Sequence, residues 1–511
     1  LEHAEQVLPE ELGRLMKEVP TYKFAALANQ LTSRLLDEPD DEFQRMLFDL
    51  VLGICSDHPY HGMYQVWAGQ NTNPKKEDEV AVSRQRATAN IGKELKAKPQ
   101  SKDIWVSVNV SNEVYCRFAA EKERYKQGMR IKVSSSPGAI SLERSFRNYK
   151  LPPPTLQVEL DPQRDYSRLP TMHKLEPNFS IASGISAPKI ITVIASNGRR
   201  YKQLVKGGSD DLRQDAIMEQ VFTSVSSLLR VHSSTRQRNL GIRTYKVQPL
   251  SSTAGIIEFV PNTLPLHDYL IPAHTKYHPK DLGSMQARKE ISDAQQSDKE
   301  KRVKVFRRIC ERFRPVMRYF HLERFPDPDE WFEKRQAYTR STAAISMLGY
   351  VLGLGDRHGH NILLDEVTGE VVHIDLGVAF EMGRVLPVPE LVPFRLTRDI
   401  VDGMGISGTE GTFRRCCEFV LEALRKEKDT IMTVLDVLRY DPLYTWSISP
   451  VRLAKLQEAQ SVVPISTAGS TTSGVTTSTR GEREREVFNE PSEADRALTV
   501  VSKKLSKGLS V

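Results

Sequence analysis

The stretch GLGDRHGHNILLDEVTGEVVHIDLGVA, residues 353–379, decides the fold of this 511-residue chain. Asp356 is followed five residues later by Asn361, and Asp375 opens an Asp-Leu-Gly sequence after a predicted strand over 371–374. Phosphoryl transfer needs a residue that orients the attacking hydroxyl and accepts its proton, and it needs oxygen ligands for magnesium. The spacing therefore predicts Asp356 as a catalytic residue, with Asn361 and Asp375 as magnesium ligands.

The order of residues in this stretch differs from that of ordinary protein kinases. Their His-Arg-Asp sequence is reversed to Asp356-Arg357-His358, and the chain has neither a GxGxxG loop nor a VAIK strand. His358 and His360 are not accompanied by a matching Cys or His set, so a metal role for this pair is disfavoured. The sequence predicts a two-lobed kinase of a different type.

A cation for the nucleotide phosphates is predicted upstream of this stretch. The strands 189–195 and 200–206 are expected to form a hairpin, and Lys206 ends the second of them. A helix predicted over 210–230 follows, with acidic residues in its first turns. Asp215 is therefore expected to hold Lys206 by an ion pair.

The turn of the same hairpin is the predicted cover for the phosphates. Asn197-Gly198 is a dipeptide typical of tight hairpin turns, and Ser196 precedes it. Consecutive backbone N–H groups in a turn can bind phosphate oxygens. We therefore expect Ser196, Asn197 and Gly198 to lie against the nucleotide phosphates.

An adenine pocket is predicted from residues of the hinge and from flat or apolar side chains elsewhere in the chain. Glu258 and Val260 end a predicted strand and have the character of an interlobe hinge, whose backbone can hydrogen-bond adenine. Tyr245, Leu363 and Ile374 are flat or apolar side chains that can form the walls of such a pocket.

The residue patterns along the chain predict an α+β fold. At roughly 150 residues per domain, its length predicts about three domains. Residues 1–150 are expected to be helical, 151–260 to hold strands around one helix, and 261–446 to be mostly helical. Residues 466–479 contain ten Ser or Thr among 14 and are a predicted linker, followed by a charged helix over 494–509.

Composition excludes several classes of protein. A net charge of +7 permits contact with polyanions without requiring it, and five irregularly spaced cysteines support neither a disulfide framework nor a zinc ribbon. We therefore expect a reducing intracellular compartment. The uncharged stretch between Arg340 and Asp356 is shorter than the ~20 residues of a spanning helix. The first residue is Leu, which predicts a piece of a larger protein.

Four motifs resemble the phosphatidylinositol-3-kinase-related protein kinases. They are LVKGGSDDLRQD (204–215), LGLGDRHGHNILLD (352–365), HIDLGVAFE (373–381) and VPFRLTRDIVDGMG (392–405). Residues 379–418 are most similar to the branch of checkpoint kinases that includes fungal regulators of telomere length. The resemblance covers nearly the whole chain.

The resemblance implies a bilobal phosphatidylinositol-3-kinase-like fold preceded by an α-helical, alpha-solenoid FAT segment. The implied parts are the end of FAT (1–75), a helical bridge (76–150), the kinase N-lobe (151–260), the C-lobe with the catalytic and activation loops (261–447), and a regulatory segment that ends before or at the start of FATC (448–511).

The resemblance also implies roles for residues. Asp356 would be the catalytic Asp, His358 would stabilise the transferring phosphate, Asn361 and Asp375 would bind magnesium, and Lys206, held by Asp215, would bind the ATP phosphates. ATP and Mg²⁺, with Mn²⁺ as an alternative ion, are the implied cofactors. Proteins with Ser or Thr followed by Gln are the implied substrates. A homodimer, partner proteins that sense DNA ends, DNA contact outside this piece and a nuclear location are implied as well.

Two alternatives remain at this point. A phosphoinositide lipid kinase needs basic residues beside its activation loop, yet between residues 376 and 394 the chain has only Arg384 against Glu381 and Glu390. A nucleic-acid-binding helical scaffold is suggested by residues 299–318, with nine Lys or Arg against two Glu. Protein kinase activity is the favoured prediction.

Overall fold

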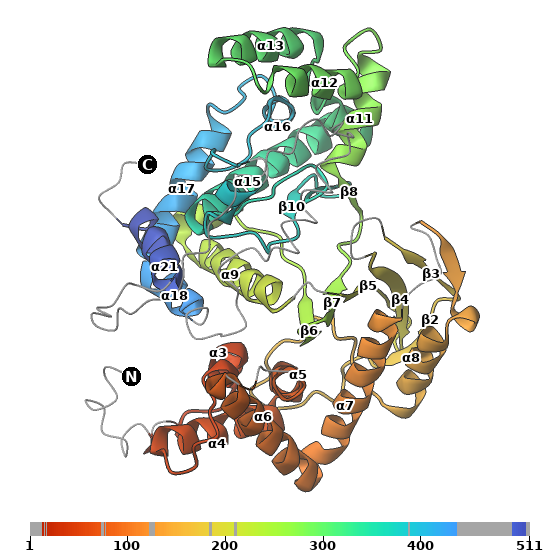
Figure 1. The fold of residues 1–511 in the computed structure, drawn as a ribbon, viewed down its shortest axis with the longest axis vertical. Coiled ribbons are helices and arrows are strands. Elements are labelled where there is room, and N and C mark those ends of the chain that lie inside the picture. The colour runs from red at the N-terminus through yellow and green to blue at the C-terminus, as the bar shows by residue number, and fades with distance from the viewer. Residues whose placement is uncertain are drawn as a thin grey trace, which may run out of the picture.

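The computed structural model describes residues 13–14, 16, 18–72, 76, 78–121, 128–182, 187–208, 212–386, 389–436 and 493–506. The predicted linker 466–479 lies outside these residues. Figure 1 shows a helical N-terminal part, a sheet with one long helix beside it, and a helical body that carries a small second sheet. The predicted α+β class is confirmed.

The N-terminal part consists of helices, most of which begin at sequence signals for helix starts. Asp41 and Asp78 accept backbone N–H bonds as caps, and Pro59 and Pro99 occupy first helical positions. The helices are α2 (Tyr22–Ala25), α3 (Ala28–Ser33), α4 (Glu42–Asp57), α5 (Pro59–Gln70), α6 (Glu79–Ala97), α7 (Pro99–Ala120) and α8 (Pro137–Asn148), with the 3₁₀ turn η1 (Val133–Ser135) before α8.

A seven-stranded antiparallel sheet follows, in the order β1-β3-β4-β5-β7-β6, with β2 paired to β4. The predicted hairpin is confirmed, because β4 and β5 pair from Lys189–Val205 to Ile194–Arg200 around a turn in which Gly198 has φ +78°. The strands are β1 (Arg130–Lys132), β2 (Met172–Leu175), β3 (Asn178–Ile181), β4 (Lys189–Ala195), β5 (Arg200–Gly207), β6 (Val247–Ser251) and β7 (Ala254–Glu258).

The expectation that residues 1–150 are helical throughout is wrong at β1, which pairs with β3 at the sheet edge. A strand of three residues is too short to show the alternation that identifies strands in a sequence. The helical part and the sheet also share one hydrophobic core, in which Tyr115 and Phe118 of α7 pack with Val193 and Ile256 of the sheet.

Helix α9 (Leu212–Val231) confirms the helix predicted over 210–230 and connects the two lobes. Its side chains Ile217, Phe222 and Leu229 belong to the large core of the C-terminal body. The short α10 (Ser233–Arg236) follows it.

The C-terminal body is mostly helical, as predicted, around a three-stranded sheet in the order β10-β9-β8. The strands are β8 (Thr263–Pro265), β9 (Ile362–Asp365) and β10 (Val371–His373). The helices are α11 (Leu266–Tyr277), α12 (Ser284–Ala294), α13 (Lys299–Arg312), α14 (Arg318–Arg324), α15 (Pro328–Leu352), η2 (Met382–Val385), α16 (Arg398–Gly403), α17 (Thr412–Lys426), α18 (Lys428–Leu435) and α21 (Glu493–Lys504). Among the described residues, no helix is both long and apolar enough to pass through a bilayer.

Candidate active site

A small apolar cluster lies where the two sheets meet. Tyr245 and Val260 from the side of the seven-stranded sheet, and Leu363 from β9, are buried in one small hydrophobic cluster, and Ile374 packs against it partly buried. These are four of the residues predicted to line an adenine pocket. The cluster is separate from the large cores of both lobes, so the two lobes meet around apolar walls suited to a flat ligand.

The connection between the lobes has the features expected of a hinge. The Glu258 N–H donates to Lys246 O at 2.8 Å, and the Phe259 N–H donates to Lys202 O at 3.0 Å. The Val260 N–H has no acceptor among the residues that the structure describes. One backbone donor beside the apolar cluster is therefore left without a described acceptor, as a hydrogen bond to a ligand such as adenine would require.

The loop after α15 carries Asp356 in the left-handed region, with φ +58°. Its backbone is held from two sides, because its N–H donates to the Glu390 carboxylate at 2.8 Å and its C=O accepts the Asn361 side-chain N–H at 2.9 Å. A left-handed conformation is unfavourable for a non-glycine residue and persists only where contacts impose it. The loop thus fixes the position of Asp356.

Arg357 joins this loop to the Asp-Leu-Gly segment. The guanidinium is buried and donates to Gly355 O at 2.8 Å, to Ile374 O at 2.7 Å and to Asp375 O. Burial lowers the pKa of Arg357, and the charges of Asp375 and Asp356 oppose this effect. The reversed Asp-Arg-His order therefore places an arginine between the two segments that carry the predicted catalytic and metal-binding residues.

Asp375 is exposed and, like Asp356, has a left-handed backbone, with φ +56°. The next residue, Leu376, donates its N–H to the Asp215 carboxylate of α9 at 2.9 Å. Gln214 of the same helix donates to Gly377 O at 2.7 Å. The start of α9 thus positions the Asp-Leu-Gly segment directly, a role that the sequence did not predict for Asp215.

The predicted metal ligands fit a hard cation. The Asn361 amide nitrogen is used by Asp356 O, which leaves its side-chain oxygen, and Asp375 adds a carboxylate. Mg²⁺ takes oxygen ligands and keeps positions for waters and substrate phosphates, so two protein ligands suffice. The described part of the chain holds no group of three or more His, Cys, Asp or Glu arranged for a metal.

His358 is exposed, and a hydrogen bond shows which ring nitrogen carries its proton. Its Nδ1 accepts the His360 N–H at 3.2 Å, so the ring proton resides on Nε2. Desolvation, then the charge of Arg357, lowers the pKa of His358, and the ring is neutral at neutral pH. It therefore offers one N–H donor. His360 itself faces Asp268 at 3.5 Å.

Lys206 lies on β5 opposite Gly255 of β7, half-buried. The following Gly207 has no room for a side chain, since a Cβ there would lie 2.5 Å from the Ala119 carbonyl oxygen at the end of α7. The end of this helix therefore fixes the strand next to Lys206. The ion pair predicted between Lys206 and Asp215 stays a prediction.

The predicted phosphate cover at Ser196, Asn197 and Gly198 is corrected by the strand register. The turn lies at one end of the β4–β5 hairpin and Lys206 lies at the other, because Ile194 pairs with Arg200 and Lys189 with Val205. Eight residues of extended strand separate Gly198 from Lys206 by roughly 25 Å. These three residues are therefore not brought to the site, although the turn itself was predicted correctly.

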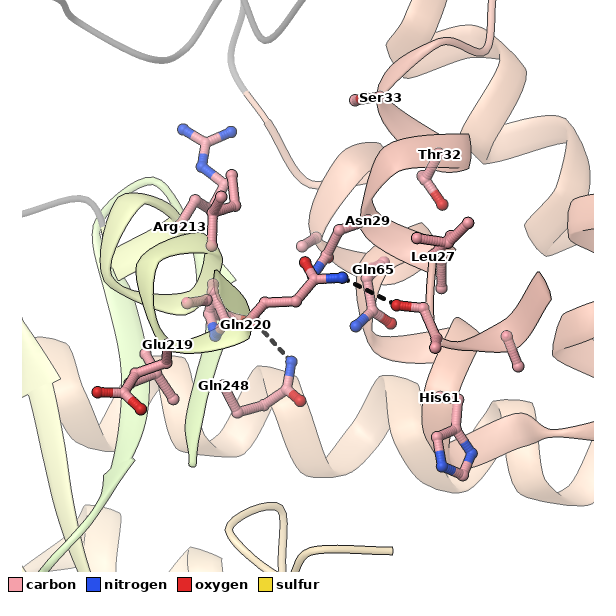
Figure 2. Close-up of a pocket in the computed structure, with 18 of the residues that line it drawn as sticks. Leu27, Asn29, Thr32, Ser33, His61, Gln65, Arg213, Glu219, Gln220 and Gln248 are labelled. Carbon is pink, nitrogen blue, oxygen red and sulfur yellow. Dashed lines mark hydrogen bonds between the residues drawn. The ribbon is translucent and has the colours of Figure 1, made fainter. Parts of the chain in front are cut away.

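The opposite side of α9 faces a cavity of about 560 Å³ that is shared with the N-terminal helices. Figure 2 shows Gln220 extending from α9 toward the helices that carry Asn29 and Gln65. Gln220 donates to Ala26 O at 2.9 Å and accepts from Gln30 at 2.9 Å. The helix that holds the Asp-Leu-Gly segment is thus hydrogen-bonded to the N-terminal helices as well.

Helix α21 contacts the residues that follow the Asp-Leu-Gly segment. Lys504 donates to Tyr350 O near the end of α15 at 2.7 Å, and it also donates to the Glu381 carboxylate. Glu381 has φ +65°, and its N–H donates to Gly353 O at 3.0 Å. One lysine therefore joins the helix before the catalytic loop to the residues after Asp375.

The sequence did not predict the positioning contacts of Asp215, Arg357, Glu390 and Lys504. The last two act over long sequence separations, and a charged residue in a run of polar residues carries no signal of its partner. Arg357 had a usable signal, because a fixed arginine between Asp356 and His358 stands where ordinary protein kinases also place an arginine.

Comparison with known proteins shows which sequences this chain resembles. The sequence profile of the family described as phosphatidylinositol 3- and 4-kinase matches residues 201–448. The serine/threonine-protein kinase TEL1 of Gibberella zeae is 59% identical over 98% of this chain and 17% of its own length. Tel1 of Schizosaccharomyces pombe is 46% identical over 99% of the chain and 18% of its own length. The serine-protein kinase ATM of Sus scrofa is 39% identical over 88% of the chain and 16% of its own length.

Solved structures of similar proteins have the same fold as this chain. The open conformation of CtTel1 superposes with a TM-score of 0.89 at 58% identity, over 99% of this chain and 18% of that one. The FAT and kinase domain of CtTel1 gives 0.87 at 58% identity, over 99% and 33%. The CtTel1 dimer with C2 symmetry gives 0.87 at 58% identity, over 99% and 18%. The chain spans about 17% of the length of the first relatives.

Proposed function

The chain belongs to the phosphatidylinositol-3-kinase-related protein kinases, close to Tel1 and ATM, and on that premise we propose that it transfers the γ-phosphate of ATP to proteins at Ser or Thr followed by Gln. The observation that carries the proposal is the arrangement of Asp356, Asn361 and Asp375. Arg357 and the Asn361 side chain hold their segments together, beside an apolar cluster between the lobes.

Asp356 orients the attacking hydroxyl of Ser or Thr and accepts its proton. The fixed backbone of its loop supports this role, since proton transfer requires the carboxylate within hydrogen-bond reach of the hydroxyl. His358 donates its Nε2 hydrogen to an oxygen of the transferring phosphoryl group, whose negative charge is spread over three equatorial oxygens in the transition state. Its neutral state leaves the proton on this nitrogen.

The remaining residues bind the nucleotide. Lys206 neutralises the phosphates, the Val260 N–H and the backbone of Glu258 hydrogen-bond adenine, and Tyr245, Leu363 and Ile374 enclose it. Asn361 and Asp375 would hold Mg²⁺, or Mn²⁺ in its place, and the ion supplies neutralisation of phosphate charge. Ser196, Asn197 and Gly198 are not part of this proposal.

A protein substrate is favoured over a lipid by the activation segment. Arg384, the basic residue between positions 376 and 394, pairs with Glu381 at 2.9 Å, and Glu390 adds a further negative charge. A phosphorylated inositol headgroup needs unpaired cations there. The basic run 299–318 is remote from the catalytic loop in sequence and lies on α13 and the loop after it.

The test of this preference compares two acceptors at equal ATP. A Ser-Gln peptide is expected to take up phosphate at least tenfold faster than the same peptide with Ser-Ala, and phosphatidylinositol vesicles are expected to take up none. Phosphorylation of the vesicles with no transfer to the peptide would show a lipid kinase instead.

The finer roles follow the branch of the family. We propose action in DNA double-strand-break checkpoint signalling and telomere maintenance, a nuclear location, activation by partner proteins that sense DNA ends, and DNA contact outside this chain. A homodimer is supported by the similar C2 dimer of CtTel1. We also propose the division into FAT end (1–75), bridge (76–150), N-lobe (151–260), C-lobe (261–447) and regulatory segment (448–511), which the likeness to the CtTel1 FAT and kinase domain supports.

Lys504→Met is expected to lower kcat about fivefold while the KM for ATP stays the same. The change removes the ammonium that joins Tyr350 O to the Glu381 carboxylate but keeps most of the apolar stem. A hydrogen bond to a charged group contributes about 1.5–3 kcal/mol, so α21 is also expected to exchange its amide hydrogens faster. Lys503→Met, at an exposed neighbouring position, is the control. Equal kcat and equal exchange in both variants would contradict the positioning role.

A further inference from the structure

Helices α12 and α13 form a hairpin that projects from the C-terminal body (Figure 1). The two helices pack on each other through a small core of their own, which contains Leu282, Ala287 and Ile309. The base of the hairpin is fixed by Arg314, whose guanidinium pairs with Asp281 at 2.7 Å. The hairpin therefore holds its shape independently of the catalytic loop.

The charges of α13 are mostly unused within the described chain. Two of its cations, Arg308 and Arg312, pair with Glu290 of α12. Five others are exposed and form no ion pair with any described residue: Lys299, Lys301, Arg302, Lys304 and Arg307. The same helix carries two acidic residues, Glu300 and Glu311, so positive charge is in excess on α13.

Two large apolar side chains lie exposed on the same helix. Phe306 is 56% exposed and Val303 is 39% exposed. At 100° per residue, these two lie roughly 60° and 120° around the helix from the buried Ile309. The arginines bound to Glu290 lie on the other side of Ile309, so Val303 and Phe306 face away from α12.

The same geometry places cations beside this apolar pair, while Glu300 and Glu311 lie on the side of α13 opposite Ile309. Lys299 and Arg307 lie on the face that holds Val303 and Phe306, and Arg302 borders it. None of these residues is covered by another described part of the chain. We call the surface formed by Lys299, Arg302, Val303, Phe306 and Arg307 the α13 face.

We propose that the α13 face is a docking site for an acidic, amphipathic segment of a partner protein, which places one or two apolar anchors between Val303 and Phe306 and its carboxylates against the surrounding Lys and Arg. This recognition combines burial of apolar side chains, which supplies affinity, with charge complementarity, which selects the partner and its orientation.

Other occupants match the α13 face less well. A nucleic acid backbone would use the cations but would leave Phe306 and Val303 without a partner. A membrane surface would need a larger apolar area than two side chains provide. An acidic protein segment uses both features together, and this is the reason for choosing it.

The helix that carries this face is hydrogen-bonded to the residues that follow the activation segment. Arg398, at the start of α16, donates to Cys310 O of α13 at 2.8 Å and to Phe313 O at 2.7 Å. Asp399 accepts the Val316 N–H at 2.8 Å. A partner docked on α13 would therefore contact a helix that is hydrogen-bonded to α16, the first helix after the activation segment.

The test uses a fluorescent helical peptide of about 18 residues, five turns long, with Leu at positions i, i+3, i+4 and i+7 and Glu at most others. Three matched probes accompany it: the peptide with Lys in place of Glu, the peptide with Ser in place of Leu, and a DNA duplex of about 20 base pairs. Fluorescence anisotropy against the full chain measures each affinity. The acidic peptide with Leu is expected to bind at least tenfold more tightly than either peptide control.

Two double variants separate the contributions. Val303→Ser with Phe306→Ser is expected to weaken the acidic peptide about tenfold, and Arg302→Gln with Arg307→Gln is expected to weaken it about tenfold and to reduce the salt dependence of binding. Phe332→Ser and Lys289→Gln replace an exposed aromatic residue and an exposed cation on other faces and are expected to change nothing. Transfer of phosphate to a Ser-Gln peptide serves as the check on folding.

Three outcomes would overturn the proposal. The first is equal binding of the acidic and basic peptides. The second is peptide binding that survives the Val303 and Phe306 change. The third is DNA binding that is tighter than peptide binding, lost in the Arg302 and Arg307 variant and unaffected by loss of the apolar pair, which would identify a polyanion surface instead.

Discussion

Asp356→Asn is expected to lower kcat about 10³-fold while the KM for ATP stays within about twofold, because loss of a catalytic base removes a factor of 10²–10⁴ and leaves the nucleotide contacts intact. Asparagine tolerates the left-handed backbone that Asp356 adopts at φ +58°, whereas alanine would add strain. The bonds to Glu390 and from Asn361 involve backbone atoms of Asp356 and survive the change. The variant therefore isolates the carboxylate.

The measurement is steady-state phosphorylation of a Ser-Gln peptide, together with binding of a fluorescent ATP analogue. Asp293→Asn, on the exposed side of α12, is the matched control and is expected to behave as the unchanged protein. Turnover by the Asp356 variant within about tenfold of normal would refute its role as the base, whatever the nucleotide affinity.

Asp375→Asn is expected to raise the half-saturating Mg²⁺ concentration at least tenfold and to lower kcat about 10²-fold. The change removes a carboxylate charge from the predicted metal site but keeps the backbone contacts to Arg357 and the neighbouring bond from Leu376 to Asp215. Loss of one ionised ligand weakens a hard cation strongly, and the phosphates lose the neutralisation that the ion provides.

Rates measured across a series of Mg²⁺ concentrations at fixed ATP test this effect, and the same series with Mn²⁺ shows whether a second ion substitutes. Glu366→Gln, which removes the partner of Arg324 on the same lobe, is the control for a lost surface carboxylate. An unchanged Mg²⁺ dependence in the Asp375 variant would assign the metal to other ligands.

Local patterns were sufficient to predict much of the fold and pocket. A run rich in β-branched residues predicted β4 with the same bounds, and apolar spacing predicted α9 within two residues at its start and one at its end. Tyr245, Leu363 and Ile374 were chosen as flat or apolar side chains and Val260 as part of the hinge, and the structure gathers all four in one cluster. These features depend on sequence neighbours, which is why they could be predicted.

Features that depend on direction or on distant partners could not be predicted. The Asn197-Gly198 dipeptide identifies a turn but does not say which end of the hairpin faces the nucleotide, and the register places it away from Lys206. Strand β1 forms only because β3 offers an edge to pair with. The contact of Lys504 with Glu381 joins residues whose separation of 123 positions leaves no local trace.

The shared core of the helical part and the seven-stranded sheet limits how this protein can be divided or inherited. A chain cut at residue 150 would lose β1, leave one edge of β3 unpaired and expose the side chains that now rest on Tyr115 and Phe118. It would also lose the carbonyl of Ala119 that fixes the strand of Lys206. Catalytic lobes encoded without the preceding helices would therefore expose apolar surface, and one of their strands would lose its support. Recombination is expected to keep the preceding helices and the catalytic lobes together.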